Sequence, residues 1–300
     1  MRNPDKIVLP APYLRWAGGK RVLAPVISSA IDSSFDHSKN KFFEPFVGGG
    51  AVFFSLASRL NGSQIVINDV NPDLVASYRV IQGDLENLIK RLNILSKDSS
   101  ATAFAKIRAE KPKTDLERAA RFIFLNKTCF NGLWRVNSSG QFNVPYGQIK
   151  NPLILDEALL RANSEYLTKA TIRLGSYITA VADAKSGDYV YLDPPYIPLN
   201  PTSSFSKYAK DDFTEIDQYA LAGAIKGLTK RGVKVIFSNS DTPLTREIYG
   251  GLLELRSISV TRSISAQATS RNKVDEVLGV NFDITGTNLG KLPLLVKRKK

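Results

Sequence analysis

Apolar residues in the first part of the chain recur in the pattern of alternating strands and helices. Between residues 10 and 80 this pattern predicts a helix, a strand, a glycine-rich turn, a second helix and a second strand. A strand, turn, helix and strand within about 30 residues form a βαβ unit, which implies a parallel sheet. The expected elements are a helix over 20–30, a strand over 41–44, a helix over 51–60 and a strand over 64–68.

The last part of the chain, from residue 166 onward, again shows the pattern of alternating strands and helices. Short apolar runs that end at Pro, Gly or polar residues predict further strands, and a longer amphipathic run predicts a helix. Together the two parts predict an α/β fold with a doubly wound, mostly parallel sheet. The expected strands are 188–192, 233–238, 252–260 and 276–282, and the expected helix is 215–230.

The middle of the chain differs from both ends. Two helical patterns, 85–95 and 114–125, lead into a polar, turn-rich stretch over 126–147, where Ser138-Ser139-Gly140 is typical of a hairpin turn. We therefore expect an inserted domain of helices and a β-hairpin. The predicted domains are 1–80 together with 166–300, and the insertion 81–165.

The chain is strongly basic, and this charge indicates the kind of partner that it binds. Lys and Arg number 41 against 28 Asp and Glu, for a net charge of +13. Such an excess favours a polyanionic partner, with nucleic acid first. The chain has no apolar run of the roughly 18 residues that a membrane helix needs, and its first residues lack the apolar stretch of a signal peptide. We therefore expect a cytoplasmic protein that does not engage a membrane.

The scarcity of histidine and cysteine limits the chemistry. With His37 and Cys129 as the sole residues of their types, neither an internal disulfide nor a zinc site of His and Cys ligands is expected. A Ser-His-Asp triad is equally unexpected. The chemistry must then depend on carboxylates, amides, aromatic rings and backbone groups.

A glycine turn follows the strand over 41–44. Gly48-Gly49-Gly50 stands where open α/β sheets bind ligands, and Asp69 at the end of the next strand is placed to accept hydrogen bonds from ribose hydroxyls. The spacing is neither that of a dinucleotide fingerprint nor that of a P-loop. A nucleoside without phosphates fits better, although these residues alone also fit a tight turn followed by a solvated aspartate.

A second candidate motif is Leu14-Arg-Trp-Ala-Gly-Gly-Lys20, just before the first helix. Its aromatic ring, turn and lysine could enclose a zwitterionic ligand that carries a carboxylate. The same residues also fit a helix start with an exposed lysine.

The strongest motif is Asp193-Pro-Pro-Tyr196, which follows a buried strand. Neither proline has an amide hydrogen to donate, and both stiffen the backbone. The Asp193 carboxylate and the Pro194 carbonyl are thus available as two acceptors for the two hydrogens of an aromatic amino group. Accepting both hydrogens makes that nitrogen more nucleophilic, and Tyr196 offers a ring for stacking a flat base. Without its neighbours, the motif also fits a rigid turn.

With these motifs in this order, the chain resembles the Dam family of bacterial and phage DNA adenine methyltransferases. The match covers nearly the whole chain, and agreement of several motifs in order is highly specific. The matching segments are Trp16 to Lys20, Phe46 to Gly50, Asn68-Asp69, Phe130 to Gly147, Asp193-Pro-Pro-Tyr-Ile-Pro-Leu, Phe205 to Phe213, Ser238-Asn239 and Arg271 to Asn281.

The resemblance implies methyl transfer from S-adenosylmethionine to the exocyclic 6-amino group of an adenine flipped out of duplex GATC. S-adenosylhomocysteine would be the product, and no metal would be required. The catalytic residues implied are Asp193, Pro194 and Tyr196. The cofactor-binding residues implied are Trp16, Lys20, Glu44, Phe46, Gly48, Asp69 and Asp193.

The same resemblance assigns DNA contacts. Arg135 matches a residue that reads guanine, as a guanidinium fork suits the two major-groove acceptors of that base. The relatives more often have tyrosine at position 130 and lysine at position 15. Phe130 and Asn131 match the pair inserted beside the flipped adenine, Leu133 and Pro145 match contacts to a thymine methyl, Arg15 matches a contact to the first guanine, and Phe205, Lys207 and Tyr208 lie in a loop that holds the DNA backbone.

Rival functions remain compatible with the motifs. Methyltransferases of the cytosine amino group usually have serine at the Asp193 position, and those of protein glutamine usually have asparagine. The tetrapeptide separates RNA adenine from DNA adenine less well, and a catalytically inactive DNA-binding protein is a further alternative. The expected partner is double-stranded DNA. The sequence fits both a solitary enzyme and one paired with a restriction endonuclease of the same site, with no obligate protein partner, in the cytoplasm of a bacterium or of a phage-infected cell.

Overall fold

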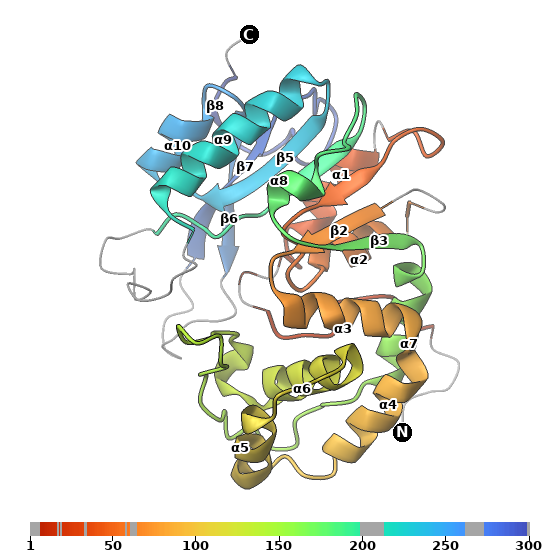
Figure 1. Cartoon of the computed structure of the whole chain (residues 1–300). Coiled ribbons are helices and arrows are strands. Elements are labelled where there is room, and N and C mark those ends of the chain that lie inside the picture. Colours follow the sequence, from red (N-terminus) through yellow and green to blue (C-terminus); the bar gives the residue numbers. More distant parts are fainter. Residues whose placement is uncertain are drawn as a thin grey trace.

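A single mixed sheet organises the computed structural model, which describes residues 7–16, 18, 20–32, 35–57, 59–60, 65–198, 213–261 and 273–298. Its strand order is β3-β2-β1-β4-β5-β7-β6-β8 (Figure 1). The strands are β1 (Phe42–Glu44), β2 (Ile65–Asp69), β3 (Ala170–Leu174), β4 (Tyr189–Leu192), β5 (Lys234–Ser240), β6 (Glu254–Thr261), β7 (Lys273–Val280) and β8 (Leu294–Val296).

The first five strands of this order are parallel, whereas β7 pairs antiparallel with both β5 and β6. The predicted α/β fold with a mostly parallel sheet is thereby confirmed. In β1, Phe43 pairs with Val66 of β2 on one side and with Val190 of β4 on the other. The strand order reverses between β1 and β4, and the carboxyl ends of parallel strands meet at such a point to form a ligand crevice.

Alternating side chains of the strands serve two cores. Phe42, Ile67 and Tyr191 belong to the core on one face, and Phe43 and Val190 to the core on the other. Strands that are apolar on both faces are typical of a sheet covered by helices on each side. The first face is covered by α1 (Ala24–Asp32), α2 (Ala51–Ala57) and α3 (Pro72–Gly83), and the second by α8 (Tyr177–Ala180), α9 (Glu215–Lys230) and α10 (Pro243–Tyr249).

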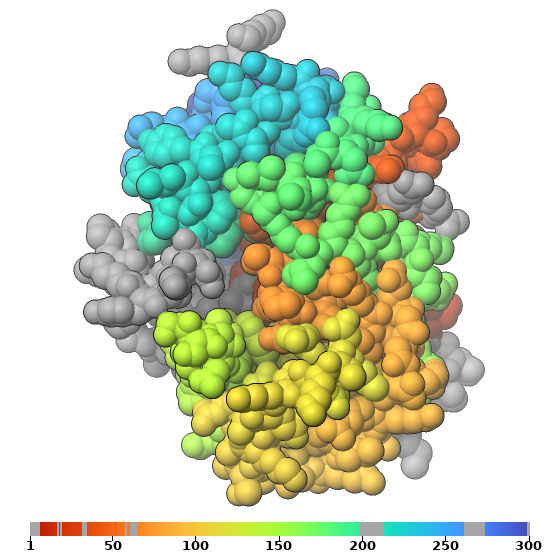
Figure 2. Space-filling model, in the orientation of Figure 1, coloured from red at the N-terminus to blue at the C-terminus, as the bar shows by residue number. Residues whose placement is uncertain are grey.

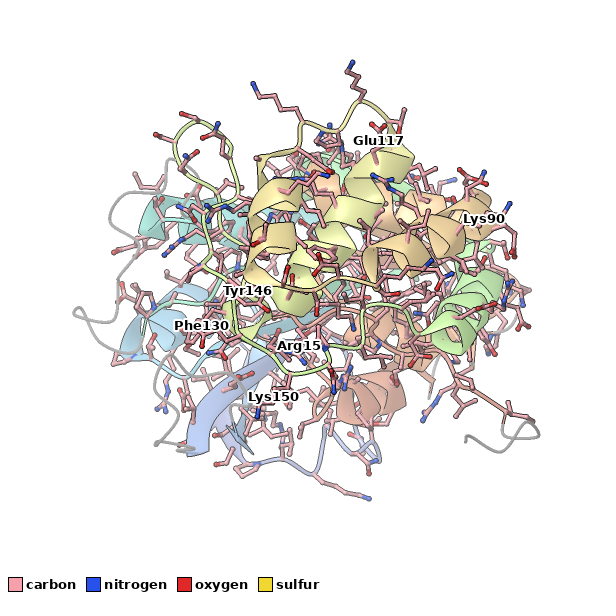
Figure 3. The ribbon with its side chains drawn as sticks, turned by 90° about the horizontal axis from the view of Figure 1, so that it is seen from below. Arg15, Lys90, Glu117, Phe130, Tyr146 and Lys150 are labelled. Carbon is pink, nitrogen blue, oxygen red and sulfur yellow. The ribbon has the colours of Figure 1, made fainter. Side chains whose placement is uncertain are left out.

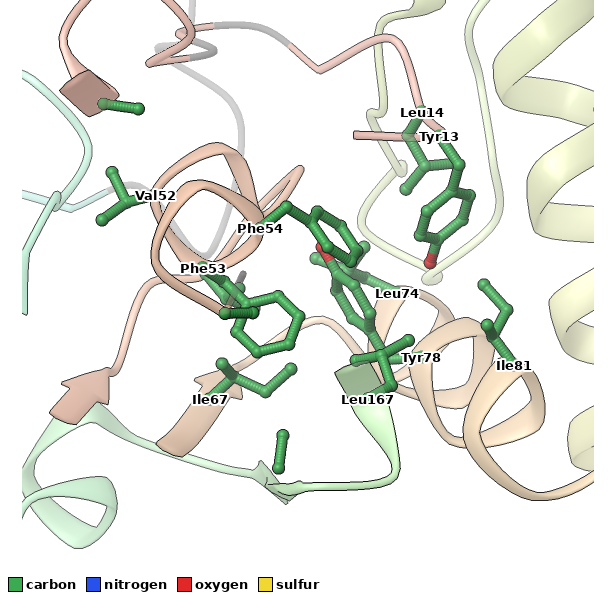
Figure 4. Close-up of a cluster of buried hydrophobic side chains, with 14 of the residues drawn as sticks. Tyr13, Leu14, Val52, Phe53, Phe54, Ile67, Leu74, Tyr78, Ile81 and Leu167 are labelled. Carbon is green, nitrogen blue, oxygen red and sulfur yellow. The ribbon is translucent and has the colours of Figure 1, made fainter. Parts of the chain in front are cut away.

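The core of the first face joins segments that are far apart in the sequence. Tyr13, Phe54 and Tyr78 pack together there, from the N-terminal segment, α2 and α3 (Figure 4). The Tyr13 ring meets the Tyr78 ring edge-on, with centroids 5.6 Å apart. The N-terminal segment is thus packed into the body of the protein.

Between β2 and β3 the chain builds mainly helices, which gather at one end of the molecule (Figures 1 and 2). Their apolar faces continue the core of the first sheet face. A hairpin follows, with Gly140 at a φ of +73° and a bridge between Val136 and Phe142, so the turn predicted at Ser138-Ser139-Gly140 is confirmed. The helices are α4 (Leu85–Leu95), α5 (Ala101–Ala109), α6 (Asp115–Thr128), the 3-10 turn η1 (Phe130–Gly132) and α7 (Glu157–Leu167).

Several boundaries differ from the sequence predictions. The helix expected over 20–30 begins at Ala24, because residues 21–23 form a turn. The strand expected over 276–282 ends at Val280 and begins at Lys273, where it pairs with β6. Among the described residues, no helix has the length and hydropathy to cross a bilayer.

Candidate active site

The glycine turn at the end of β1 supports an aromatic ring. Gly48 has a φ of +48°, and a Cβ there would lie 2.7 Å from Nε1 of Trp16, so glycine permits the indole to rest on the backbone. The buried Tyr78 donates its hydroxyl hydrogen to the Gly48 carbonyl at 2.8 Å. The two sequence motifs around Trp16 and Gly48 therefore form one wall.

Asp69 ties this turn to the end of β2. Its Oδ2 accepts the Gly48 N–H at 3.1 Å, and its Oδ1 accepts the Asn71 N–H at 3.0 Å. Burial raises the pKa of the Asp69 carboxyl, and these backbone donors partly offset the rise. A carboxylate oxygen can accept a second hydrogen bond, so Asp69 keeps capacity for ligand hydroxyls.

Glu44, the last residue of β1, is buried with an unsatisfied oxygen. Its side chain is 3% exposed, and among the described residues no donor reaches Oε2. Burial raises the Glu44 pKa well above its usual range, and the nearby charge of Asp193 raises it further. A buried acceptor without a partner costs free energy, which a ligand that brings a donor or a positive charge would recover. Glu44 therefore fits the amino group or sulfonium of a cofactor.

Asp193 follows β4 directly and is held by two side chains. Lys20 Nζ lies 3.1 Å from Asp193 Oδ1, and the Ser238 hydroxyl donates to the same oxygen at 2.7 Å. Ser238 and Tyr191 share a further hydrogen bond of 2.9 Å between their hydroxyls. Among the described residues, both contacts to the carboxylate end on Oδ1, which leaves Oδ2 for a substrate.

Lys20 also reaches the aromatic ring of the tetrapeptide. Its Nζ lies 4.5 Å from the centroid of the Tyr196 ring and donates to the Gly18 carbonyl at 2.7 Å. The Tyr196 hydroxyl donates to Glu276 Oε2 at 2.9 Å. Burial and the charge of Asp193 raise the pKa of Tyr196 well above its usual range, so the phenol stays neutral.

The sequence alone assigned no individual role to three residues of this neighbourhood. Ser238 and Glu276 lie in segments that match the family, but neither segment signals a contact with the tetrapeptide. Tyr177 stacks on Phe46 with ring centroids 5.3 Å apart, and it stands in a segment without a motif.

The residues expected to contact DNA gather around η1. Phe130 is 41% exposed, and its N–H donates to the Pro145 carbonyl at 2.9 Å. Asn131 has a φ of +54°, a conformation that asparagine tolerates better than most residues. Leu133 closes the turn, since its N–H donates to the Phe130 carbonyl at 3.2 Å.

Arg135 stands on the hairpin beyond this turn and is exposed. Its Nε donates to Asn143 Oδ1 at 2.7 Å, which orients the guanidinium. Arg15 is also exposed, and Figure 3 shows it on the side of the molecule that carries Phe130 and Lys150. Phe205, Lys207 and Tyr208 lie outside the described residues.

In the described ranges no group of three or more His, Cys, Asp or Glu side chains is arranged to hold a metal ion. Metal-independent chemistry stays an expectation from the resemblance.

A mostly parallel α/β sheet, with a glycine turn after β1, an acid at the end of β2 and Asp-Pro-Pro-Tyr after β4, is the fold and site of a methyltransferase. Within that class, the chain belongs to the D12 class N6 adenine-specific DNA methyltransferases, whose family profile matches residues 16–264. It is therefore an adenine-specific DNA methyltransferase, and the resemblance to the Dam family is confirmed.

Individual relatives match nearly end to end. The chain is 40% identical over 279 residues to the type II methyltransferase M1.LlaDCHI of Lactococcus lactis subsp. cremoris, a match that covers 90% of this chain and 95% of that protein. It is 38% identical over 288 residues to the type II methyltransferase M.MjaIII of Methanocaldococcus jannaschii, covering 90% and 99%. It is 35% identical over 272 residues to the DNA adenine methylase of Escherichia coli K12, covering 89% and 94%.

Proposed function

We propose that this enzyme methylates the exocyclic amino group of the adenine in duplex GATC, with S-adenosylmethionine as the methyl donor. The observation that carries the proposal is the fixed carboxylate of Asp193, which Lys20 and Ser238 hold through one oxygen. A carboxylate oriented before the substrate arrives needs little reorganisation during the reaction, which is how fixed electrostatics lower a barrier.

The wall around the glycine turn suits the cofactor. When bound, S-adenosylmethionine supplies a methyl group on a positively charged sulfur and leaves as S-adenosylhomocysteine. Trp16 and Gly48 would border it, Asp69 would accept its ribose hydroxyls, and the open oxygen of Glu44 would face its positive charge. Phe46, stacked on Tyr177, would border its adenine.

The tetrapeptide would bind the target base. Asp193 Oδ2 accepts one hydrogen of the adenine amino group, and the Pro194 carbonyl accepts the other. Tyr196 stacks on the base, and its hydroxyl bond to Glu276 restrains the ring. Because a paired adenine is inaccessible, the base must leave the stack, which costs a few kcal/mol. Phe130, partly exposed at the tip of η1, would fill the gap with Asn131.

We propose that residues 81–165 form the DNA-recognition domain. Arg135 would read a guanine through its guanidinium fork, which Asn143 already orients. Leu133 and Pro145 would contact a thymine methyl, and Arg15 the outer guanine. Phe205, Lys207 and Tyr208 would hold the backbone near the flipped base. The type II names of two relatives support a role beside a restriction endonuclease of the same site.

Sequencing of DNA from an expressing host that has no adenine methylation of its own tests the target site. We expect methyladenine at GATC in the wild type. Arg135→Ala should add methylation at sites with a changed guanine, since discrimination worth about 1–3 kcal/mol is lost. Lys150→Ala is the control, at an exposed lysine on the side of Arg15 and Phe130 (Figure 3): loss of a phosphate-type contact should lower methylation evenly across sites.

Two outcomes would contradict this proposal differently. Methylation at another sequence would overturn the GATC assignment and leave the chemistry intact. Label transferred only to RNA or protein in a tritiated-methyl assay would overturn DNA as the substrate.

Glu44→Gln should weaken cofactor binding about tenfold, because a charge-assisted contact is lost. In the wild type the raised pKa of Glu44 makes cofactor affinity increase as pH rises through that pKa, since binding a cation favours the ionised carboxylate. Calorimetric titrations at a series of pH values above the usual range of a glutamate should show this slope in the wild type and lose it in the variant.

Glu44→Gln should weaken cofactor binding but raise the stability of the folded protein at alkaline pH. The folded protein binds its Glu44 proton more tightly than the unfolded chain, so the free energy of unfolding falls as pH rises from the unfolded pKa toward the raised folded pKa. Glutamine removes that loss, and the variant should have the higher Tm at alkaline pH. A lower Tm there, with unchanged cofactor affinity, would refute the assignment.

A further inference from the structure

Two buried asparagines hold the N-terminal segment in the same way. Asn126 of α6 accepts the Arg15 N–H at 2.9 Å through Oδ1 and donates to the Arg15 carbonyl at 2.7 Å through Nδ2. Asn163 of α7 does the same with Ala11, at 3.0 and 2.9 Å. Both side chains are fully buried. Each amide thus replaces the pairing that a strand neighbour would give.

Asn126 differs from Asn163 by a third bond, which leads to the base-reading turn. Its Nδ2 also donates to the Gly132 carbonyl at 2.9 Å. Gly132 has a φ of +66°, and a Cβ built there would overlap the Arg15 Cβ. Arg15, Asn126 and Gly132 therefore form one joint in which no member can shift without breaking a buried hydrogen bond or a tight packing contact.

This joint lies between the two binding regions of the enzyme. On one side, Trp16 follows Arg15 in the chain and rests on the glycine turn at Gly48. On the other side, Gly132 ends η1, which carries Phe130 and Asn131. One amide side chain separates the wall of the cofactor pocket from the turn expected to enter the DNA.

We propose that Asn126 is a positioning residue that couples cofactor binding to target selection, an inference that rests on the proposed roles of the two regions. A cofactor that fixes Trp16 also fixes Arg15, and through Asn126 it fixes the η1 turn in its base-reading position. The coupling is reciprocal: the correct DNA site tightens cofactor binding by the same factor as the cofactor tightens DNA binding. Asn163 holds the same segment without touching the turn, so its role is structural.

The test compares wild type, Asn126→Ala and the matched control Asn163→Ala, well below their unfolding temperatures. The first readout is the Kd for duplex DNA with and without saturating S-adenosylhomocysteine, at one salt concentration. The second is the ratio of kcat/KM for the target duplex to that for a duplex with one outer base pair changed. Neither ratio responds to a uniform loss of stability or of active enzyme.

We expect Asn126→Ala to bring the coupling factor close to 1 and to lower the site discrimination by about tenfold. Asn163→Ala should lower Tm and leave both ratios at wild-type values. Gly132→Ala, which forces Arg15 away from the turn, should lower the coupling factor and the site discrimination as Asn126→Ala does. It replaces Asn126→Ala in the test if Asn126→Ala does not fold.

Three results would overturn the inference. The first is that Asn126→Ala keeps the wild-type coupling factor and site discrimination. The second is that Asn163→Ala lowers both as much as Asn126→Ala does. The third is that the Kd of the wild type for duplex DNA is the same with and without S-adenosylhomocysteine. Methylation of duplex DNA by the wild type is measured first. Its absence would count against the proposed function itself, before any variant is compared.

Discussion

Asp193→Ala is expected to lower kcat by at least about 10³-fold, because it removes the acceptor that the site is built to orient. The loss includes the bond to the substrate amino group and the partner that neutralises Lys20, 3.1 Å away. Affinity for duplex DNA should stay within about twofold, since phosphate contacts supply most of it. Single-turnover methylation and DNA titration of the same preparation measure both quantities.

Ser238→Ala is the matched control for this experiment. It keeps the carboxylate and removes the hydroxyl that donates to Asp193 Oδ1 at 2.7 Å. Loss of one orienting hydrogen bond of about 1 kcal/mol should lower kcat roughly five- to tenfold. Full activity in Asp193→Ala would refute the catalytic role, and equal losses in the two variants would mean that folding, not the carboxylate, had been disturbed.

The fold was largely predictable because most strands are apolar on both faces. β1, β4 and β5 contain the short apolar runs Phe42-Phe43, Tyr189 to Leu192 and Val235 to Phe237, which are typical of a sheet covered on both faces. β3 was not predicted, because it is not apolar on both faces. It lies at the sheet edge, where only Ala170 is buried, and its residues Ala-Thr-Ile-Arg-Leu lack an apolar run. Helix α3 was also missed, although Asn71 caps it and Pro72 begins it.

The site was predictable where its residues are close in sequence. Asp69 ends β2 and Asp193 directly follows β4, so a local pattern suffices to single them out. The supporting contacts are long-range: Ser238 is 45 residues from Asp193, Glu276 is 80 from Tyr196, and Asn126 is 111 from Arg15. A single sequence carries no local sign of such pairs, because they are created by the strand order and by the packing of α6.

Lys20 shows how packing changes an interpretation. The sequence suggested a lysine that meets the carboxylate of a ligand. In the structure the Lys20 side chain is 7% exposed, and its ammonium contacts the Asp193 carboxylate and lies over the Tyr196 ring. A buried cation paired with a carboxylate offsets part of the desolvation cost of both. Lys20 thus links the cofactor wall to the tetrapeptide, and its charge sets the field in which an adenine amino group would react.

The second large effect is expected at Tyr196. Tyr196→Ala should lower kcat/KM by about 10- to 100-fold, because stacking of a base on an aromatic ring is worth about 1–3 kcal/mol. Tyr196→Phe keeps the ring and loses the hydroxyl bond to Glu276, so its loss should be only a few-fold. Steady-state methylation of the target duplex compares the two variants with the wild type.

Fluorescence of 2-aminopurine at the target position separates stacking from a general defect. A flipped base brightens when it leaves the duplex stack and is quenched again when it stacks on a tyrosine. Tyr196→Ala should therefore give a brighter complex than the wild type at saturating enzyme. Glu276→Gln should behave like Tyr196→Phe, since each weakens the same 2.9 Å contact and leaves the ring in place. Wild-type fluorescence and rate in Tyr196→Ala would show that another surface holds the flipped adenine.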